Sequence, residues 1–155
     1  MSVTIKLTGF SELKKELEQL SKSAGKAVLR RALKKSAQPL ADMMRDLAPR
    51  GDTTTDDLAD SIAISSKLSK RQKGLHKRMF RDDKASVEMF VGAGPDPAAV
   101  NQEFGNVNHG PQAFARPAWE QDKMAMLDRL SQDLWAELEK SIKRAEAKAA
   151  RQARG

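Results

Sequence analysis

Two spacings of apolar residues, every second residue and every third or fourth, divide this chain into expected strands and helices. Alternation over residues 3–7 predicts a short, half-buried strand. Leucines at 13, 17 and 20 share one face and predict a helix capped by Ser11. After a weak break at residues 21–25, a longer helix is expected to reach about residue 47, on a stripe formed by Leu29, Leu33, Leu40, Met44 and Leu47. Pro39 lies inside this pattern and should kink or divide the helix.

The middle of the chain has shorter and more polar segments. Residues 48–57 read as a polar loop, and a short turn then leads into a strand near residues 61–66. Residues 67–83 have few apolar side chains and predict a long, exposed hairpin loop. Alternation over residues 86–91 predicts the second strand of a pair, with Phe90 on the opposite side from Val87, Met89 and Val91. A turn follows at residues 92–97, and a short helical turn is expected at residues 98–104.

One long helix is expected to close the chain, opening at Pro117 as its first residue. Its apolar stripe shrinks to alanine after Ile142 while positive charge accumulates, so the last turns should leave the body. The predicted fold class is α+β, a small antiparallel sheet packed on one face by helices, with a long C-terminal helix. Residues 1–143 form the single expected domain, and residues 144–155 form a basic, frayed helical tail.

Composition supports one modest, mostly aliphatic core. The chain has 155 residues, of which 39% are apolar and 5% aromatic. Cysteine is absent, which excludes disulfides, zinc–thiolate sites and thiol nucleophiles. The first ten residues lack the apolar core of a signal peptide, and no window approaches the length of a membrane span. We therefore expect a soluble protein with no membrane partner.

Positive charge gathers in two segments of a chain whose net charge is +7. Residues 67–84 contain eight Lys or Arg and two Asp, and residues 140–155 contain six Lys or Arg and one Glu. Contact with the phosphates of a nucleic acid and a simple solvated hairpin both explain the first segment. Phe80 is its one aromatic residue, so a base-stacking platform is not expected. The candidate contacts with DNA in a lumen, or with a partner, are Lys67, Lys70, Arg71, Lys73, Lys77, Arg78 and Arg81.

Catalytic and metal-binding patterns are missing from the sequence. His109 and His76 are the two histidines, and they lack the H-x-x-E or H-x-x-x-H spacing of a metal site. There is no G-x-S-x-G element, and no Gly-Lys-Ser/Thr follows the glycines at 92 and 94. We therefore expect no enzyme activity, no cofactor and no metal ion.

Residues 101–120, NQEFGNVNHGPQAFARPAWE, combine two turns with the start of the long helix. We interpret this segment as a rigid corner that serves structure or a subunit interface. Its aromatic residues would anchor the long helix to the sheet, while Glu103 and Arg116 would pair either within the chain or across a subunit contact. The corner residues singled out are Glu103, Phe104, Gly105, Phe114, Arg116, Pro117 and Trp119.

Two segments together resemble a phage family. Residues 55–62 are similar to a T-G-x-L-x-x-S-I element through Thr55, Leu58, Ser61 and Ile62, and the corner is similar to E-F-G followed by Q-x-F-x-R-P-A. In this order, with a basic hairpin between them, they resemble the tail-component family of lambda-like long-tailed phages named for gene product 10. The resemblance covers about residues 55–120. Asp56 replaces the glycine of the first element and Asn106 replaces a threonine of the corner.

The resemblance implies a structural virion protein of a tailed phage or prophage. It implies a neck, tail-completion or tail-terminator subunit, a head–tail connector that forms a homo-oligomeric ring, expected to be a hexamer or dodecamer. Partners would be neighbouring neck or tail proteins and genomic DNA in the channel, with assembly in the cytoplasm of the bacterial host. Two alternatives stay open, a small basic nucleic-acid-binding protein and a toxin or enzyme of unrecognised chemistry.

Overall fold

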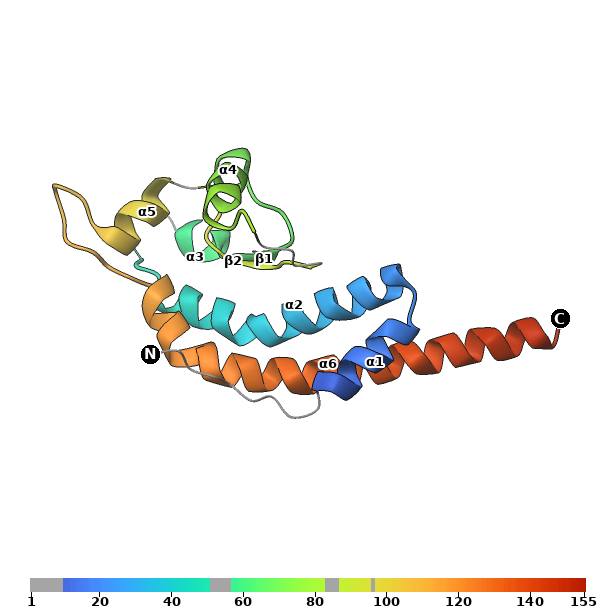
Figure 1. Ribbon diagram of the computed structural model, residues 1–155. Helices are drawn as coiled ribbons and strands as arrows, with labels where there is room; N and C mark the ends of the chain where they lie inside the picture. The colour runs from blue at the N-terminus through green and yellow to red at the C-terminus, as the bar shows by residue number, and fades with distance from the viewer. Residues whose placement is uncertain (1–9, 51–56, 83–86, 96) are drawn as a thin grey trace.

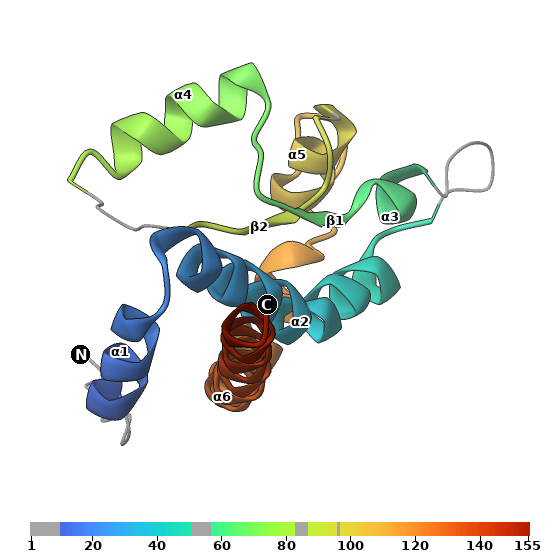
Figure 2. The same cartoon turned by 90° about the vertical axis from the view of Figure 1, so that its right-hand side faces the viewer.

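Two long helices, α2 (Lys22–Leu47) and α6 (Ala115–Ala153), pack side by side and run in opposite directions (Figure 1). The structure is a computed structural model that describes residues 10–50, 57–82, 87–95 and 97–155. Helix α1 (Phe10–Gln19) lies beside this pair, close to the start of α2 (Figure 2). The strand predicted at residues 3–7 lies outside the described residues.

Helix α2 runs through Pro39 as one element, so of the two predicted outcomes, a kink or a division, the division does not occur. Proline has no N–H to donate to the carbonyl of residue 35, and its ring crowds that turn. The neighbouring carbonyl of Ser36 instead accepts two bonds from the guanidinium of Arg129 on α6, at 3.2 and 3.0 Å. The guanidinium of Arg129 thus gives hydrogen bonds to a carbonyl in the turn that precedes Pro39, and α2 continues to Leu47.

Two apolar clusters hold the helices together. In the first, Leu13 of α1 and Val28 of α2 pack against Leu134 and Leu138 of α6. The second lies at the other end of the α2–α6 pair and joins them to the short elements around the sheet. Its buried members are Leu40, Ala41, Met44, Ala48, Leu58, Ala59, Ile62, Ala99, Phe114 and Ala118. Of the stripe predicted for α2, Leu29, Leu40 and Met44 pack in these clusters. Leu33 instead lines a hollow beside α6, and Leu47 is 40% exposed.

The sheet has two short antiparallel strands in the described residues, β1 (Ala63–Ser65) and β2 (Phe90–Gly92), with Ile64 opposite Val91. The strand pair is confirmed, although each strand is shorter than predicted. Helix α3 (Asp57–Ser61) replaces the turn expected before β1. Met89 and Val91 face α2, whereas the ring of Phe90 contacts His76 on the opposite side, as the alternation indicated.

The prediction of a hairpin loop at residues 67–83 is wrong, because α4 (Lys70–Met79) occupies most of that segment. Ser69 begins the helix with a capping box: its hydroxyl accepts from the amide of Gln72, whose side chain accepts from the amide of Ser69. Figure 2 shows α4 on one side of the strands and α2 on the other. Helices therefore lie on both faces of the sheet, and the expectation that they pack on one face alone is wrong.

Helix α5 (Pro97–Phe104) confirms the short helical segment that precedes the corner. Helix α6 begins at Ala115, so the expectation that Pro117 is its first residue is wrong by two positions. Residues 143–155, the end of α6 and the two residues after it, are all exposed and project beyond the other elements, as predicted (Figure 1). The α+β class is confirmed, with a small antiparallel sheet and a long C-terminal helix.

Candidate functional site

The carboxylate of Glu103, at the end of α5, caps the start of α6. Its Oε2 accepts the amides of Phe114 and Ala115 at 2.8 and 2.9 Å, and its Oε1 accepts the amide of Arg116 at 3.0 Å. The next residue is Pro117, which has no N–H. The first amides of α6 that need a partner therefore all have one, which explains why the helix begins before the proline.

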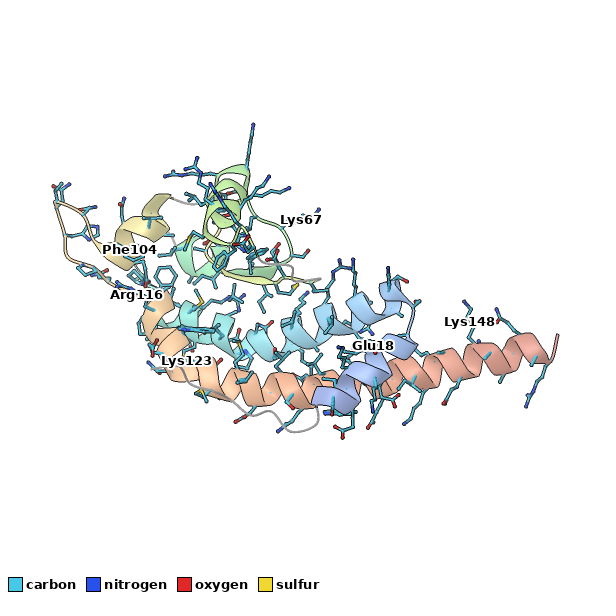
Figure 3. All side chains as sticks on the ribbon, viewed as in Figure 1. Glu18, Lys67, Phe104, Arg116, Lys123 and Lys148 are labelled. Carbon is cyan, nitrogen blue, oxygen red and sulfur yellow. The ribbon has the colours of Figure 1, made fainter. Side chains whose placement is uncertain are left out.

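Arg116 closes the same corner from the other side. Its Nε donates to Glu103 Oε1 at 2.8 Å and a terminal nitrogen donates to the Glu103 carbonyl at 2.7 Å. The guanidinium carbon lies 4.8 Å from the centre of the Phe104 ring, and Figure 3 shows these two side chains together. The Glu103–Arg116 pair thus forms within one chain.

Glu103 is only 6% exposed, and its surroundings keep it charged. Burial by itself raises the pKa of this carboxyl, but the hydrogen bonds from Ala115, Phe114 and Arg116 together outweigh burial and hold the pKa below its ordinary value. The negative charge also faces the positive end of the α6 dipole. The corner is therefore stiffened by an ionised carboxylate at neutral pH.

A projecting loop of residues 105–112, called here the corner arm, joins α5 to α6 (Figure 1). Gly105 turns the chain with a φ of +77°, and a Cβ there would lie 2.9 Å from the nitrogen of Pro111. The amide oxygen of Asn106 accepts the backbone amides of Asn108 and His109 at 2.8 and 3.1 Å. Hydrogen bonds within the arm thus stabilise its turn, and the imidazole of His109 forms hydrogen bonds with the side chain of Asn106 and the carbonyl of Gly110.

The corner arm and α5 present apolar side chains to solvent. Val107 is 100% exposed at the turn of the arm, and Phe104 and Val100 are 63% and 61% exposed. By contrast, Phe114 is buried in the core at the start of α6. The corner aromatics therefore divide into an internal anchor, Phe114, and an outward-facing residue, Phe104.

An apolar groove, called here the α2 groove, lies between α2, β2 and the first half of α6. Two adjoining hollows of about 550 and 420 Å³ form it and share Leu40, Val91 and Trp119 in their linings. Trp119 is 46% exposed in this groove, so its indole lies open along one side. The remaining apolar lining residues of the larger hollow are Leu33, Ala37, Met89, Met124, Met126, Leu127 and Leu130.

The segment that resembles the first family element supports the strands. Leu58 and Ile62 are buried in the core, and the Ser61 hydroxyl donates to the Leu58 carbonyl at 2.8 Å. The amide of Gly94 donates to the Ser61 carbonyl at 3.2 Å, which ties the end of α3 to the chain after β2. Thr55 lies outside the described residues.

The basic residues predicted from the sequence surround α4. Lys70, Arg71, Lys73, Lys77 and Arg78 are exposed on the helix, Lys67 precedes it and Arg81 follows it. His76 links the helix to β2. The centre of its ring lies 4.9 Å from that of Phe80 and 5.2 Å from that of Phe90, and its Nε2 lies 3.4 Å from Oε1 of Glu88. The basic side chains therefore stand on a helix instead of a loop.

An ion pair that the sequence analysis did not identify, Asp122–Arg129, lies at the contact of α6 with α2. The Asp122 carboxylate is 5% exposed and accepts two bonds from the Arg129 guanidinium, at 3.0 and 2.6 Å. Arg129 also donates to the Ser36 carbonyl at the proline turn of α2. Opposite charges seven residues apart fall on one helix face, and this spacing was the available signal.

The described ranges hold no group of three or more potential metal ligands. Nor does any helix in these ranges combine the length and the apolarity that a bilayer span requires. The corner and the α2 groove present exposed apolar side chains, a property suited to contact with another protein.

Comparison with known protein families gives a match. The profile of the family described as "Bacteriophage HK97-gp10, putative tail-component" matches residues 11–105. This range includes Leu58, Ser61, Ile62 and the Glu103–Gly105 turn but ends before the Phe114–Trp119 part of the corner. No curated protein and no solved structure matches the chain.

Proposed function

Because this chain belongs to the HK97-gp10-like family of phage tail components, we propose that it forms a homo-oligomeric ring at the head–tail junction of a tailed phage or prophage. It is a structural phage protein, and family membership gives it a place in the virion. The proposed role is that of a neck, tail-completion or tail-terminator subunit, contacting neighbouring neck or tail proteins.

The observation that carries this proposal is the presence of two exposed apolar surfaces, one projecting and one hollow, on one chain. The corner arm presents Val107 with its whole side chain exposed, beside exposed Phe104 and Val100. The α2 groove offers an apolar hollow with Trp119 and Met124 open to solvent. Apolar surface of this kind is stabilised when a partner covers it.

The arm of one copy fits the α2 groove of the next as a head-to-tail contact. A contact between two different surfaces repeats around an axis and closes into a ring when the rotation permits. The Glu103 cap and the turn at Gly105 fix the direction of the arm, so each copy would add at the same angle. The proposed ring is a hexamer or a dodecamer.

Sedimentation velocity and negative-stain electron microscopy of the purified protein test the proposal. A discrete ring is expected, and Val107→Asp should shift the protein towards monomers because it places a charge in the apolar contact. Met79→Asp is the matched control, since Met79 is 75% exposed on α4, away from the corner. Rings that survive Val107→Asp but not Met79→Asp would place the contact on α4 instead.

A further inference from the structure

Basic residues from two separate segments of the sequence line one cleft, between α2 and the chain after β1. It measures about 420 Å³ and is lined by Arg30, Arg31 and Lys34 of α2, by residues 64–67, and by Met89. Its four Lys or Arg come from segments more than 30 residues apart. No carboxylate is among the lining residues. The cleft is called here the basic cleft.

Three of these four cations have no acidic partner among the residues that the structure describes. The fourth cation, Arg31, has its partners on α6: its Nε donates to Glu137 at 2.7 Å and a terminal nitrogen donates to Ser141. Lys35, four residues after Arg31 on α2 and outside the cleft lining, pairs with Asp133 at 3.0 Å. Within the described ranges, no ion pair of 4.0 Å or less involves Arg30, Lys34 or Lys67.

The backbone brings these three residues to the same cleft. Arg30 and Lys34 are four residues apart on one face of α2, about 6 Å along the helix axis. The amide of Lys67 donates to the Ser65 hydroxyl at 3.0 Å, which holds the turn that brings Lys67 over α2. Figure 3 shows Lys67 on the α4 side of the strands, above α2. The basic face of α4 begins three residues later, at Lys70.

We propose that the basic cleft binds backbone phosphates of duplex nucleic acid without reading the base sequence. Regularly spaced phosphates match a row of unpaired cations, and their counterions are released on binding. The lining has no aromatic residue, so base stacking on a single strand has no platform there. The basic helix α4 follows Lys67 after three residues, and its exposed Lys and Arg would give a bound duplex a second set of phosphate contacts.

The ring proposal and this one are independent, because the cleft is complete within one chain. Fluorescence anisotropy with a labelled duplex of about 20 bp, titrated at several salt concentrations, measures the phosphate contacts directly. The test variant is Arg30→Gln/Lys34→Gln/Lys67→Gln. The control is Lys14→Gln/Lys15→Gln/Arg50→Gln, which removes the same charge from exposed positions on α1 and after α2. Circular dichroism and sedimentation are recorded for both, so that loss of folding or of oligomers is seen separately.

The wild type is expected to bind the duplex with an affinity that falls steeply as salt rises. The cleft variant should lose at least about tenfold in affinity, and the slope of log K against log salt should become shallower by about 3, or roughly 0.9 per lost phosphate contact. The control should keep a slope within about 1 of the wild type. Equal losses in both variants would mean that net charge alone matters, which overturns the proposal. Unchanged binding by the cleft variant, or stronger competition by polyglutamate than by unlabelled duplex at equal charge, would overturn it as well.

Discussion

The carboxylate of Glu103 decides how α5 and α6 meet. A buried acid is stable only when hydrogen bonds and charges compensate for lost hydration, and here three amides and one guanidinium supply them. The sequence singled out Glu103 and Arg116 as a pair, because an acid and a base flank the two turns. It did not show that the acid caps α6, since that needs α5 and residues 114–116 to fold against each other.

Glu103→Ala should lower the free energy of unfolding by about 2–4 kcal/mol, because several amides of α6 and the Arg116 guanidinium lose their acceptor. Urea denaturation followed by circular dichroism measures the change. Glu120→Ala serves as the control, since that carboxylate is exposed and, among the described residues, forms an ion pair with Lys123 alone. The control should change stability by less than about 0.5 kcal/mol. Similar effects from the two substitutions would contradict the capping role of Glu103.

Acid should weaken the fold partly through Glu103. Because the pKa of this carboxyl is lower in the folded chain than its ordinary 4.5, its contribution is fully present above that value. The contribution is lost as pH falls through the folded pKa. The melting temperature of the wild type should therefore drop more between about pH 6 and about pH 3 than that of Glu103→Gln. Parallel pH profiles for the two proteins would show that Glu103 is not held charged by its neighbours.

Gly105 and Gly110 provide a matched pair within the corner arm. Gly105→Ala should destabilise the protein by about 1–3 kcal/mol, because φ is positive and the new Cβ would crowd Pro111. Gly110→Ala meets no atom within 4 Å and should be near neutral. Thermal unfolding of both variants makes the comparison. If Gly110→Ala proved the more harmful, the arm would have a different turn.

Among the elements, α4 shows where sequence patterns were misleading. The strand pair and the two long helices follow from apolar spacing, because their stripes pack against extensive partners. Residues 70–79 have no buried side chain, so apolar periodicity gave almost no signal there. The usable signal was local, Ser69 followed three residues later by Gln72, a capping box at the start of a helix. The bond between Arg129 and the Ser36 carbonyl likewise needs the fold, since 93 residues separate them.

The helical state of α4 can be tested by its own residues. Gly74→Ala should strengthen this helix by about 0.5–1 kcal/mol, because nothing lies within 4 Å of the added Cβ and alanine favours helix over glycine. Ser69→Ala should weaken it by about 1 kcal/mol through loss of the cap. Hydrogen exchange of amides 73–79, followed by mass spectrometry, reports both changes. A loop would exchange equally fast in all three proteins.

Across the complete chain, α6 joins a packed half to a projecting half. Its first part faces both apolar clusters, whereas residues 143–155 contact solvent and include Lys148 at the projecting end (Figure 3). The apolar stripe that fades after Ile142 predicted this arrangement. The corner arm and the α2 groove were less predictable, because an exposed valine and a hollow between helices leave no pattern in the sequence.

Removing residues 144–155 should leave the domain folded. These residues are exposed and add no member to either cluster, so the free energy of unfolding should change by less than about 0.5 kcal/mol. Urea denaturation of the truncated and complete chains gives the comparison. A large loss of stability would place the domain boundary beyond residue 143.

Disulfide trapping tests the head-to-tail contact most directly, because the chain contains no cysteine of its own. Val107→Cys places a thiol on the corner arm, and Met124→Cys places one at the α2 groove. Under mild oxidation, Val107→Cys/Met124→Cys should give a ladder of covalent multimers that ends at the closed ring, while each single variant stays uncrosslinked. Dimers formed by Val107→Cys alone, or a double variant that remains monomeric at concentrations where the wild type assembles, would contradict the contact between arm and groove.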